Sequence, residues 1–174
     1  MTVLQKENIV LRPLQEQDKQ AIASLLNNKK ICDNLRDFIP YPYSEQNAQE
    51  FIAFTQSENP TMTFAILAES NFCGVIGLVG EKDIHRKNAE IGYWLGEPFW
   101  GKGITSIAVG LITNYALHQL DFARVHTGIF EYNLASMRVL EKNGYQREGI
   151  FKKALFKNNQ FWDEHRYAFV KSGI

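Results

Sequence analysis

This 174-residue chain has only two cysteines, no formal net charge and no long hydrophobic run. The two cysteines, Cys32 and Cys73, lie at no metal or redox spacing and are too few to staple a chain of this size with disulfides. Nineteen Lys and Arg balance nineteen Asp and Glu, so the net charge of the whole chain does not attract nucleic acid. No window approaches the roughly 20 apolar residues that a membrane span needs.

These absences favour a reduced, cytoplasmic chain with no membrane partner and no direct nucleic-acid partner. The first twelve residues become polar before the apolar core of a signal peptide could form. The chain is 45% hydrophobic and carries no repeat or linker, which indicates one domain over residues 1–174. We expect no bound metal, because the four histidines have no second ligand at metal spacing: His85, His118, His126 and His165.

Changes of hydrophobic period along the chain predict the order of helices and strands. Strands are expected at 8–14, 62–68, 71–81, 89–95, 124–130, 145–156 and 161–170, and helices at 16–27, 47–54, 104–115 and 133–143. Between the first two helices lies an aromatic, proline-rich loop. An antiparallel first half joined to one crossover of the strand-helix-strand type indicates a mixed α/β fold, with helices on the faces of the sheet.

One turn of the chain has the composition of an anion site. The strand 89–95 runs through the turn 96–103 directly into a long amphipathic helix. Gly101 and Gly103 let the backbone adopt positive φ and approach a ligand closely, while the N–H groups and dipole of the helix start favour an anion. Lys102 adds a cation, and the first helical turn adds two hydroxyl donors, those of Thr105 and Ser106. The pattern predicts a bound phosphate or pyrophosphate.

This turn has three other interpretations. The glycines could serve only as a tight strand-to-helix connection. A nucleotide P-loop is disfavoured, because Lys102 is followed by Gly103 and not by Ser or Thr. A dinucleotide fold would explain a helix opened by Gly101, Gly103 and Ser106 and an acid, Glu131, after the next strand. That fold lacks support here because the third glycine is missing and the first half of the chain is not built of parallel units.

Two motifs resemble those of the GCN5-related N-acetyltransferases. Glu90-Ile-Gly-Tyr-Trp-Leu-Gly-Glu-Pro-Phe-Trp-Gly-Lys-Gly-Ile104 is similar to their acetyl-CoA motif, and Asn133-Leu-Ala-Ser136 with Leu140-Glu-Lys-Asn-Gly-Tyr145 is similar to their next motif. The segments 11–14, 34–38 and 149–162 resemble the branch that acetylates the N-termini of ribosomal proteins. One departure is Pro98, where the family often has Gln or Arg. The similarity covers nearly the whole chain.

The resemblance implies a fold and a co-substrate site. The expected fold is a central, mixed, mostly antiparallel sheet of about seven strands with helices on both faces, in which strand 89–95 splays from the strand that starts near Arg124. The pantetheine arm of acetyl-CoA would enter this gap, and an N–H of the Trp94 to Leu95 region would polarise the thioester carbonyl. The residues expected to bind acetyl-CoA are Trp94, Leu95, Gly96, Gly101, Lys102, Gly103, Ile104, Thr105, Asn133 and Ser136.

The resemblance also implies catalytic roles. Ser136, in the first turn of its helix, would protonate the leaving thiolate, and Asn133 would both cap that helix and bind the co-substrate arm. The branch's glutamate base corresponds to Leu155, so this carboxylate is missing. Glu90 is the first substitute, because a carboxylate on the splayed strand could order water toward the amine. Further candidates are Asp37, Asp163 and Glu164.

The acceptor is expected to be a primary amine. If the branch resemblance holds, the acceptor pocket includes Arg12, Asp37, Phe38 and Tyr41, and the acceptor is a protein N-terminus, in particular that of a ribosomal protein. A polyamine or antibiotic acceptor, or a CoA-binding module without catalysis, remain alternatives on the same fold. No nucleophile motif is present, so transfer should be direct. Monomer and homodimer remain equally open.

Overall fold

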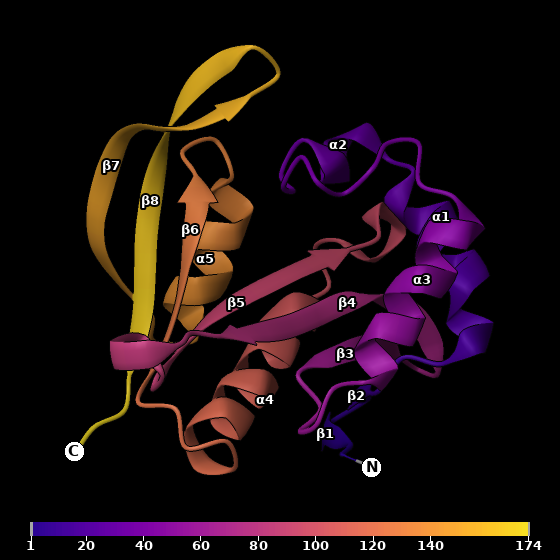
Figure 1. Ribbon diagram of the computed structural model, residues 1–174, viewed down its shortest axis with the longest axis horizontal. Helices are drawn as coiled ribbons and strands as arrows, with labels where there is room; N and C mark the ends of the chain where they lie inside the picture. The colour runs from indigo at the N-terminus through magenta and orange to yellow at the C-terminus, as the bar shows by residue number, and fades with distance from the viewer. Residues whose placement is uncertain (1, 174) are drawn as a thin grey trace.

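Eight strands form one sheet in the computed structural model, which describes residues 2–173 (Figure 1). Their spatial order is β1-β2-β3-β4-β5-β6-β8-β7. Neighbouring strands are antiparallel, except for β5 and β6, which are parallel. The strands are β1 (Leu4–Lys6), β2 (Ile9–Arg12), β3 (Thr63–Ala68), β4 (Asn71–Gly80), β5 (Asn88–Leu95), β6 (Arg124–Phe130), β7 (Gln146–Lys157) and β8 (Gln160–Val170).

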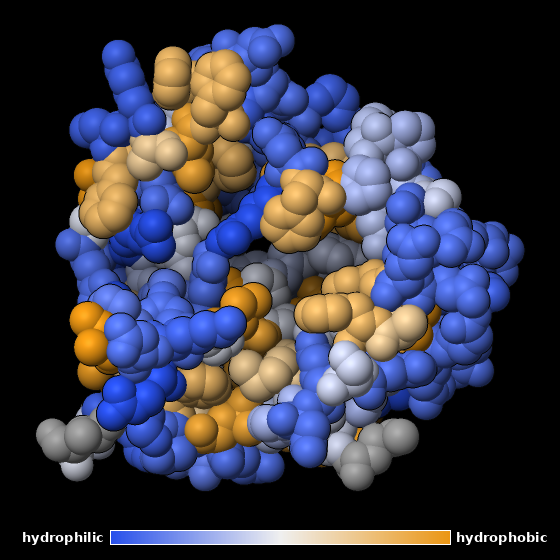
Figure 2. Space-filling model, in the orientation of Figure 1, coloured by the Kyte–Doolittle hydropathy of each residue, from blue (hydrophilic) through white to orange (hydrophobic). Residues whose placement is uncertain are grey.

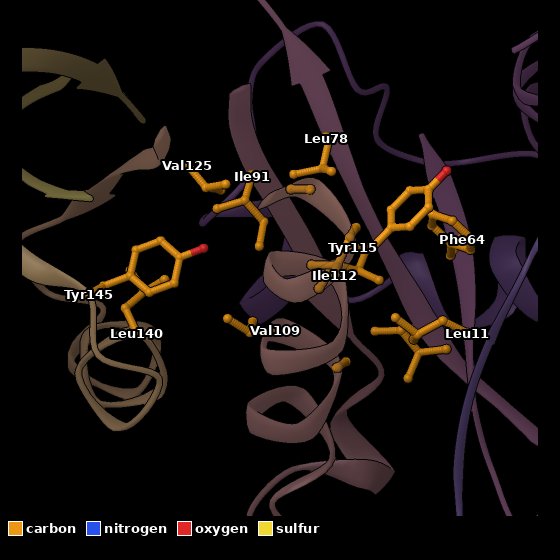
Figure 3. Packing of buried hydrophobic residues seen from close by; sticks show 14 of the residues in the cluster. Leu11, Phe64, Leu78, Ile91, Val109, Ile112, Tyr115, Val125, Leu140 and Tyr145 are labelled. Atoms are coloured by element: carbon orange, nitrogen blue, oxygen red, sulfur yellow. The ribbon is translucent and has the colours of Figure 1, made fainter. Parts of the chain in front are cut away.

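The helices cover both faces of the sheet and bury two hydrophobic cores. In β3, Phe64 and Ile66 belong to the core formed with α4 and α5, while Ala65 between them belongs to the core formed with α1 and α3. Figure 3 shows the first core around α4, with Val109 and Ile112 of this helix among the labelled side chains. The helices are α1 (Lys19–Leu26), α2 (Lys29–Cys32), α3 (Glu45–Gln56), α4 (Ile104–His118) and α5 (Leu134–Lys142).

The expected fold is confirmed, with a few elements added. The expected strands and helices agree with the structure to within a few residues, and Ser44 caps the N-terminus of α3. The sequence pattern missed α2 and the short β1, which raises the strand count from about seven to eight. In the described residues both cysteines are free, and no helix there is long and apolar enough to cross a membrane.

The pairing of β5 with β6 is short, and the two strands then diverge. They pair only from Asn88 with Arg124 to Glu90 with His126. Beyond that point β5 stays on β4 as far as Leu95, while β6 stays on β8. The gap between them is visible in Figure 1. The expected splayed pair is therefore present.

A large bulge bends the β7–β8 hairpin. The register shifts between Phe151 and Leu155, and Lys153 adopts a positive φ of 53°. Asp163 on β8 holds the bulge, because its carboxylate accepts the Lys153 N–H at 2.9 Å and pairs with Lys152 Nζ at 2.7 Å. A bulge increases local twist and redirects a strand. The hairpin tip consequently leans toward α2 (Figure 1).

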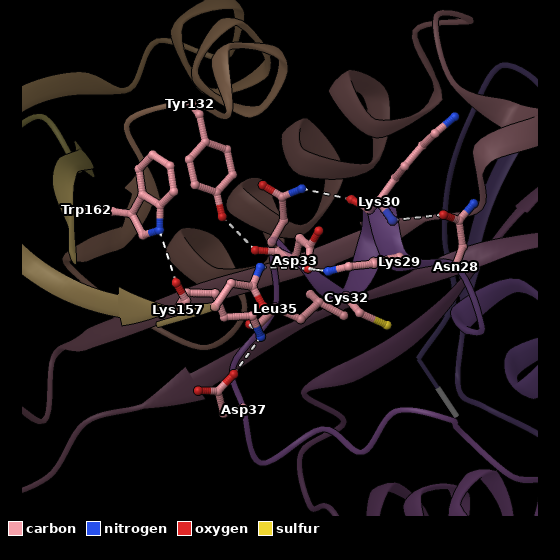
Figure 4. Close-up of polar contacts among 12 residues, drawn as sticks. Asn28, Lys29, Lys30, Cys32, Asp33, Leu35, Asp37, Tyr132, Lys157 and Trp162 are labelled. Atoms are coloured by element: carbon pink, nitrogen blue, oxygen red, sulfur yellow. Dashed lines mark hydrogen bonds and ion pairs between the residues drawn. The ribbon is translucent and has the colours of Figure 1, made fainter. Parts of the chain in front are cut away.

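The bent tip is tied to the segment that follows α2 (Figure 4). Lys157 Nζ donates to the Leu35 carbonyl at 2.9 Å and to Asp37 Oδ1 at 2.6 Å. Asn158 Nδ2 donates to Asp33 Oδ1 at 2.9 Å. These contacts join segments more than a hundred residues apart in the sequence. They form a bridge over the side of the sheet where β5 and β6 diverge.

Candidate active site

A cavity of about 1560 Å³ occupies the gap between the splayed strands. It extends from the start of α4 and the first turns of α5 to the loop after α2 and the hairpin tip. Figure 2 shows the corresponding hollow near the centre of this face, bordered by hydrophobic side chains. The two ends of the cavity differ in chemistry, with backbone donors at one end and ion pairs at the other.

The glycine turn forms a cradle at the first end. Gly101 and Gly103 have φ values of +75° and +78°, and a Cβ added to either would meet nothing within 4 Å. Gly103 is the N-cap of α4 and both glycines line the cavity. The N–H groups of a first helical turn have no intrahelical acceptor. An open, positively polarised backbone of this kind fits a diphosphate.

Some residues expected at the cradle lie elsewhere. Lys102 is outside the cavity lining, and its Nζ lies over the Phe99 ring at 5.7 Å from the ring centre. Gly96 is also outside the lining, since its N–H donates to the Cys73 carbonyl at 2.8 Å and an added Cβ would meet Leu25 at 2.9 Å. Gly96 therefore serves close packing of the turn. The remaining cradle residues, Ile104 and Thr105, line the cavity as expected.

Two cations of α5 line the cavity and were missed by the sequence analysis. Arg138 and Lys142 are four residues apart, and both line the cavity. Their spacing places them on one side of the helix, which was a usable signal in the sequence. Asn143 connects α5 to the cradle, because its Nδ2 donates to the Ser106 carbonyl at 3.0 Å and to Ser106 Oγ at 3.2 Å.

The edge of β5 supplies backbone groups to the gap. The Gly96 N–H points to β4, where it reaches Cys73, and alternate residues of a strand point their N–H groups to opposite sides. The N–H groups of Tyr93 and Leu95 therefore face the gap. The Leu95 carbonyl accepts the Trp100 Nε1–H at 2.7 Å, which fixes the end of the strand. Within the expected region from Trp94 to Leu95, the Leu95 N–H is oriented to donate to a carbonyl in the gap. The partly buried Trp94 lines the cavity and packs against the second core.

Ser136 lies where the second motif predicts, at the start of α5. Asn133 Oδ1 accepts the Ser136 N–H at 3.2 Å, which confirms Asn133 as the N-cap. Ser136 Oγ lies 2.7 Å from the Tyr93 hydroxyl, and both residues line the cavity. Burial raises the pKa of Tyr93 to about 12, although the hydrogen bond to Ser136 lowers it. The sequence pattern did not predict this contact, because the two residues lie 43 positions apart.

Two carboxylates line the other end of the cavity near the splay. Glu90 on β5 forms an ion pair with Arg36 in the loop after α2. Glu164 on β8 is only 9% exposed, and Oε2 accepts from Arg166 Nε at 2.8 Å. Its carboxyl group occupies the space beside Gly128, where any Cβ would clash with it. Both groups are candidates to accept a proton from an amine.

The other expected acids are held by neighbouring cations. Asp37 lines the cavity and pairs with Lys157, whereas Asp163 holds the hairpin bulge and lies outside the lining. The Lys152 ammonium lowers the pKa of Asp163. Leu155, which stands where the resembled branch has its glutamate, lines the cavity. An apolar side chain therefore faces the acceptor side at this position.

Two of the four expected acceptor residues do not reach the cavity. Nη1 and Nη2 of Arg12 each donate to the buried carboxylate of Asp18 at 2.7 Å, so Arg12 fixes the turn before α1. Tyr41 is also outside the lining, because the loop directs it to the surface. Phe38 lines the cavity mouth and is 79% exposed.

Comparisons with known proteins identify the family. Residues 8–146 match the model of the acetyltransferase (GNAT) domain. The ribosomal-protein-serine acetyltransferase of Escherichia coli (strain K12) is 26% identical over 171 residues, covering 96% of this chain and 95% of the relative. The spermidine N(1)-acetyltransferase of the same organism is 23% identical over 158 residues, covering 88% and 81%.

A solved structure of RimL, a ribosomal L7/L12 alpha-N-protein acetyltransferase in complex with coenzyme A, is 25% identical. It superposes with a TM-score of 0.86 and covers 97% of this chain and 98% of that one. The cradle, the splayed strands and the family match agree with one another. The chain therefore belongs to the GNAT family of acetyltransferases and is an N-acetyltransferase with acetyl-CoA as its co-substrate.

Proposed function

We propose that this N-acetyltransferase transfers the acetyl group directly to the N-terminal α-amine of a protein, in particular a ribosomal protein. The observation that carries the proposal is the cavity itself, which joins the glycine cradle to an acceptor end through the gap between β5 and β6. Two relatives whose names state ribosomal proteins as substrates align with nearly the whole chain.

In this proposal the co-substrate supplies the acetyl thioester, and the chain orients it. Arg138, Lys142 and the cradle hold the diphosphate, while Asn133 contacts the arm. The Leu95 N–H polarises the carbonyl. Glu90 accepts the proton of the amine through water, the C–N bond forms as the C–S bond breaks, and Ser136 donates to the departing sulfur.

The charges at the acceptor end favour a single amine over a polycation. Three of the four carboxylates in the cavity lining have a cation beside them: Glu90 with Arg36, Asp37 with Lys157, and Glu164 with Arg166. The fourth, Glu50 on α3, accepts a hydrogen bond from the Gln46 amide. A polyamine site would need unpaired negative charge. An α-amine has a pKa near 8 and a lysine amine a pKa near 10.4, so at neutral pH the neutral fraction of an α-amine is about 250 times larger. A carboxylate held in an ion pair is therefore a sufficient base for an α-amine.

The test is release of CoA thiol from acetyl-CoA with three acceptors. The first is a set of peptides copying ribosomal-protein N-termini, the second the same peptides with blocked N-termini and one lysine, and the third spermidine. We expect turnover with the first set alone, and mass spectrometry should locate the acetyl group on the α-nitrogen. Ser136→Ala should reduce kcat about tenfold to a hundredfold with little change in KM for acetyl-CoA. Turnover with spermidine in preference, or CoA binding without any turnover, would refute the proposal.

A further inference from the structure

Tyr93 connects the splayed strand to the helix that carries Ser136. It lies on β5, and its hydroxyl meets Ser136 Oγ at 2.7 Å across the inner wall of the cavity. A serine in the first turns of a helix usually bonds a backbone group of its own helix. Among the hydrogen bonds of residues 2–173, the Tyr93 contact is the one that the Ser136 hydroxyl makes.

The direction of this hydrogen bond matters for the chemistry. A hydroxyl has one proton to donate. Burial keeps the Tyr93 phenol protonated, since its pKa is about 12. When the phenol donates to Ser136 Oγ, the serine proton is free to point into the cavity. When the serine donates to the phenol, the free proton is that of the phenol, and the serine offers no donor to the sulfur.

We propose that Tyr93 is a positioning residue that donates to Ser136 and so directs the serine hydroxyl at the co-substrate sulfur. The inference rests on the proposed role of Ser136. Tyr93 acts through Ser136, and no proton leaves the phenol. The pair would stabilise the thiolate that forms when the C–S bond breaks, because a hydrogen bond to a charged acceptor is stronger than one to a neutral acceptor.

The chain provides a matched control for this pair. Tyr145 and Thr113 also hold their hydroxyls 2.7 Å apart, and both residues are buried. Neither lines the cavity. Tyr145→Phe removes the same kind of hydrogen bond without touching the site, so it separates a general loss of packing from a loss of positioning.

The experiment measures binding of CoA and of S-methyl-CoA, a thioether that cannot ionise, between pH 6.5 and 9 by calorimetry. The ratio of the two affinities isolates the thiol from the titration of phosphate groups and of the other titratable groups in the cavity lining, which are Lys30, Arg36, Asp37, Tyr43, Glu50, Glu90, Arg138, Lys142, Lys157 and Glu164. We expect the ratio to rise about tenfold toward high pH in the wild type, as the thiol ionises near pH 8.5. Tyr93→Phe and Ser136→Ala should flatten this rise, and Tyr145→Phe should retain it.

Turnover provides the second readout. We expect Tyr93→Phe to lower kcat with KM for acetyl-CoA unchanged, and the double variant with Ser136→Ala to be no slower than Ser136→Ala alone. A wild-type pH response in Tyr93→Phe, or additive losses in the double variant, would overturn the inference. A pH-dependent ratio that Tyr93→Phe removes, in a protein without transfer activity, would leave the inference standing and refute the proposed function.

Discussion

Replacing Gly103 by alanine should separate co-substrate binding from folding. Gly103 has a φ of +78°, and the left-handed conformation costs a residue with a Cβ about 1–2 kcal/mol. The added Cβ would meet nothing within 4 Å in the chain itself, so no packing clash adds to this cost. We therefore expect the free energy of unfolding to fall by about 1–2 kcal/mol.

The same methyl group would lie in the space where the diphosphate approaches the first N–H groups of α4. One hydrogen bond to a charged group contributes about 1.5–3 kcal/mol, so its loss should weaken CoA binding about tenfold to a hundredfold. Calorimetry of CoA binding, together with urea unfolding, measures both effects on the same sample.

Gly144→Ala is the matched control for this variant. Gly144 has a φ of +82° at the end of α5 and lies outside the cavity lining, and its added Cβ would meet the Phe169 ring at 3.2 Å. It should lose at least as much stability as Gly103→Ala while retaining wild-type affinity for CoA. Unchanged CoA affinity in Gly103→Ala, or an equal loss of affinity in both variants, would refute the cradle.

Three further predictions concern other parts of the molecule. Arg12→Ala should destabilise the fold by about 3–5 kcal/mol because it leaves buried Asp18 unpaired, and unchanged KM values for both substrates would verify that Arg12 is structural. Lys142→Gln should weaken CoA binding about two- to fivefold at low salt and hardly at all in 0.5 M salt, as calorimetry at two salt concentrations would show. The pKa of Tyr93 is raised from 10.0 to about 12, so between these pH values the folded state keeps a proton that the unfolded state releases. The free energy of unfolding should therefore fall as the pH rises from 10 to about 12. Urea unfolding of Tyr93→Phe should lack this part of the fall.

The features that could be predicted from the sequence are those specified by residues close together in the chain. The cradle depends on a strand, two glycines and a helix within 89–118, and β6 has the expected bounds. The Asn133 cap bonds a residue three positions on. Hydrophobic period and cap chemistry act over one or two turns, so such elements follow from local rules.

The features that were missed depend on contacts between distant segments. The ion pair of Arg36 with Glu90 joins residues 54 apart, and the bridge from Lys157 to Asp37 spans 120. The bend of the β7–β8 hairpin, which brings this bridge into place, depends on Asp163. From the sequence, Asp163 was predicted only as a candidate base. A strand of three residues, β1, carries too little pattern to be recognised.

This division between local and distant contacts also separates the two halves of the reaction. The end of the cavity that faces acetyl-CoA is built from two compact segments, 93–106 and 133–143, whereas the acceptor end is assembled from the loop 33–38, the splayed strand and the hairpin tip 155–158. Two relatives named for different acceptors, a ribosomal protein and spermidine, are 26% and 23% identical to this chain. We expect the choice of acceptor to depend on the loop and on the hairpin tip, which follows the bulge at Lys153. Substitutions there should therefore change the acceptor preference and leave CoA affinity nearly constant.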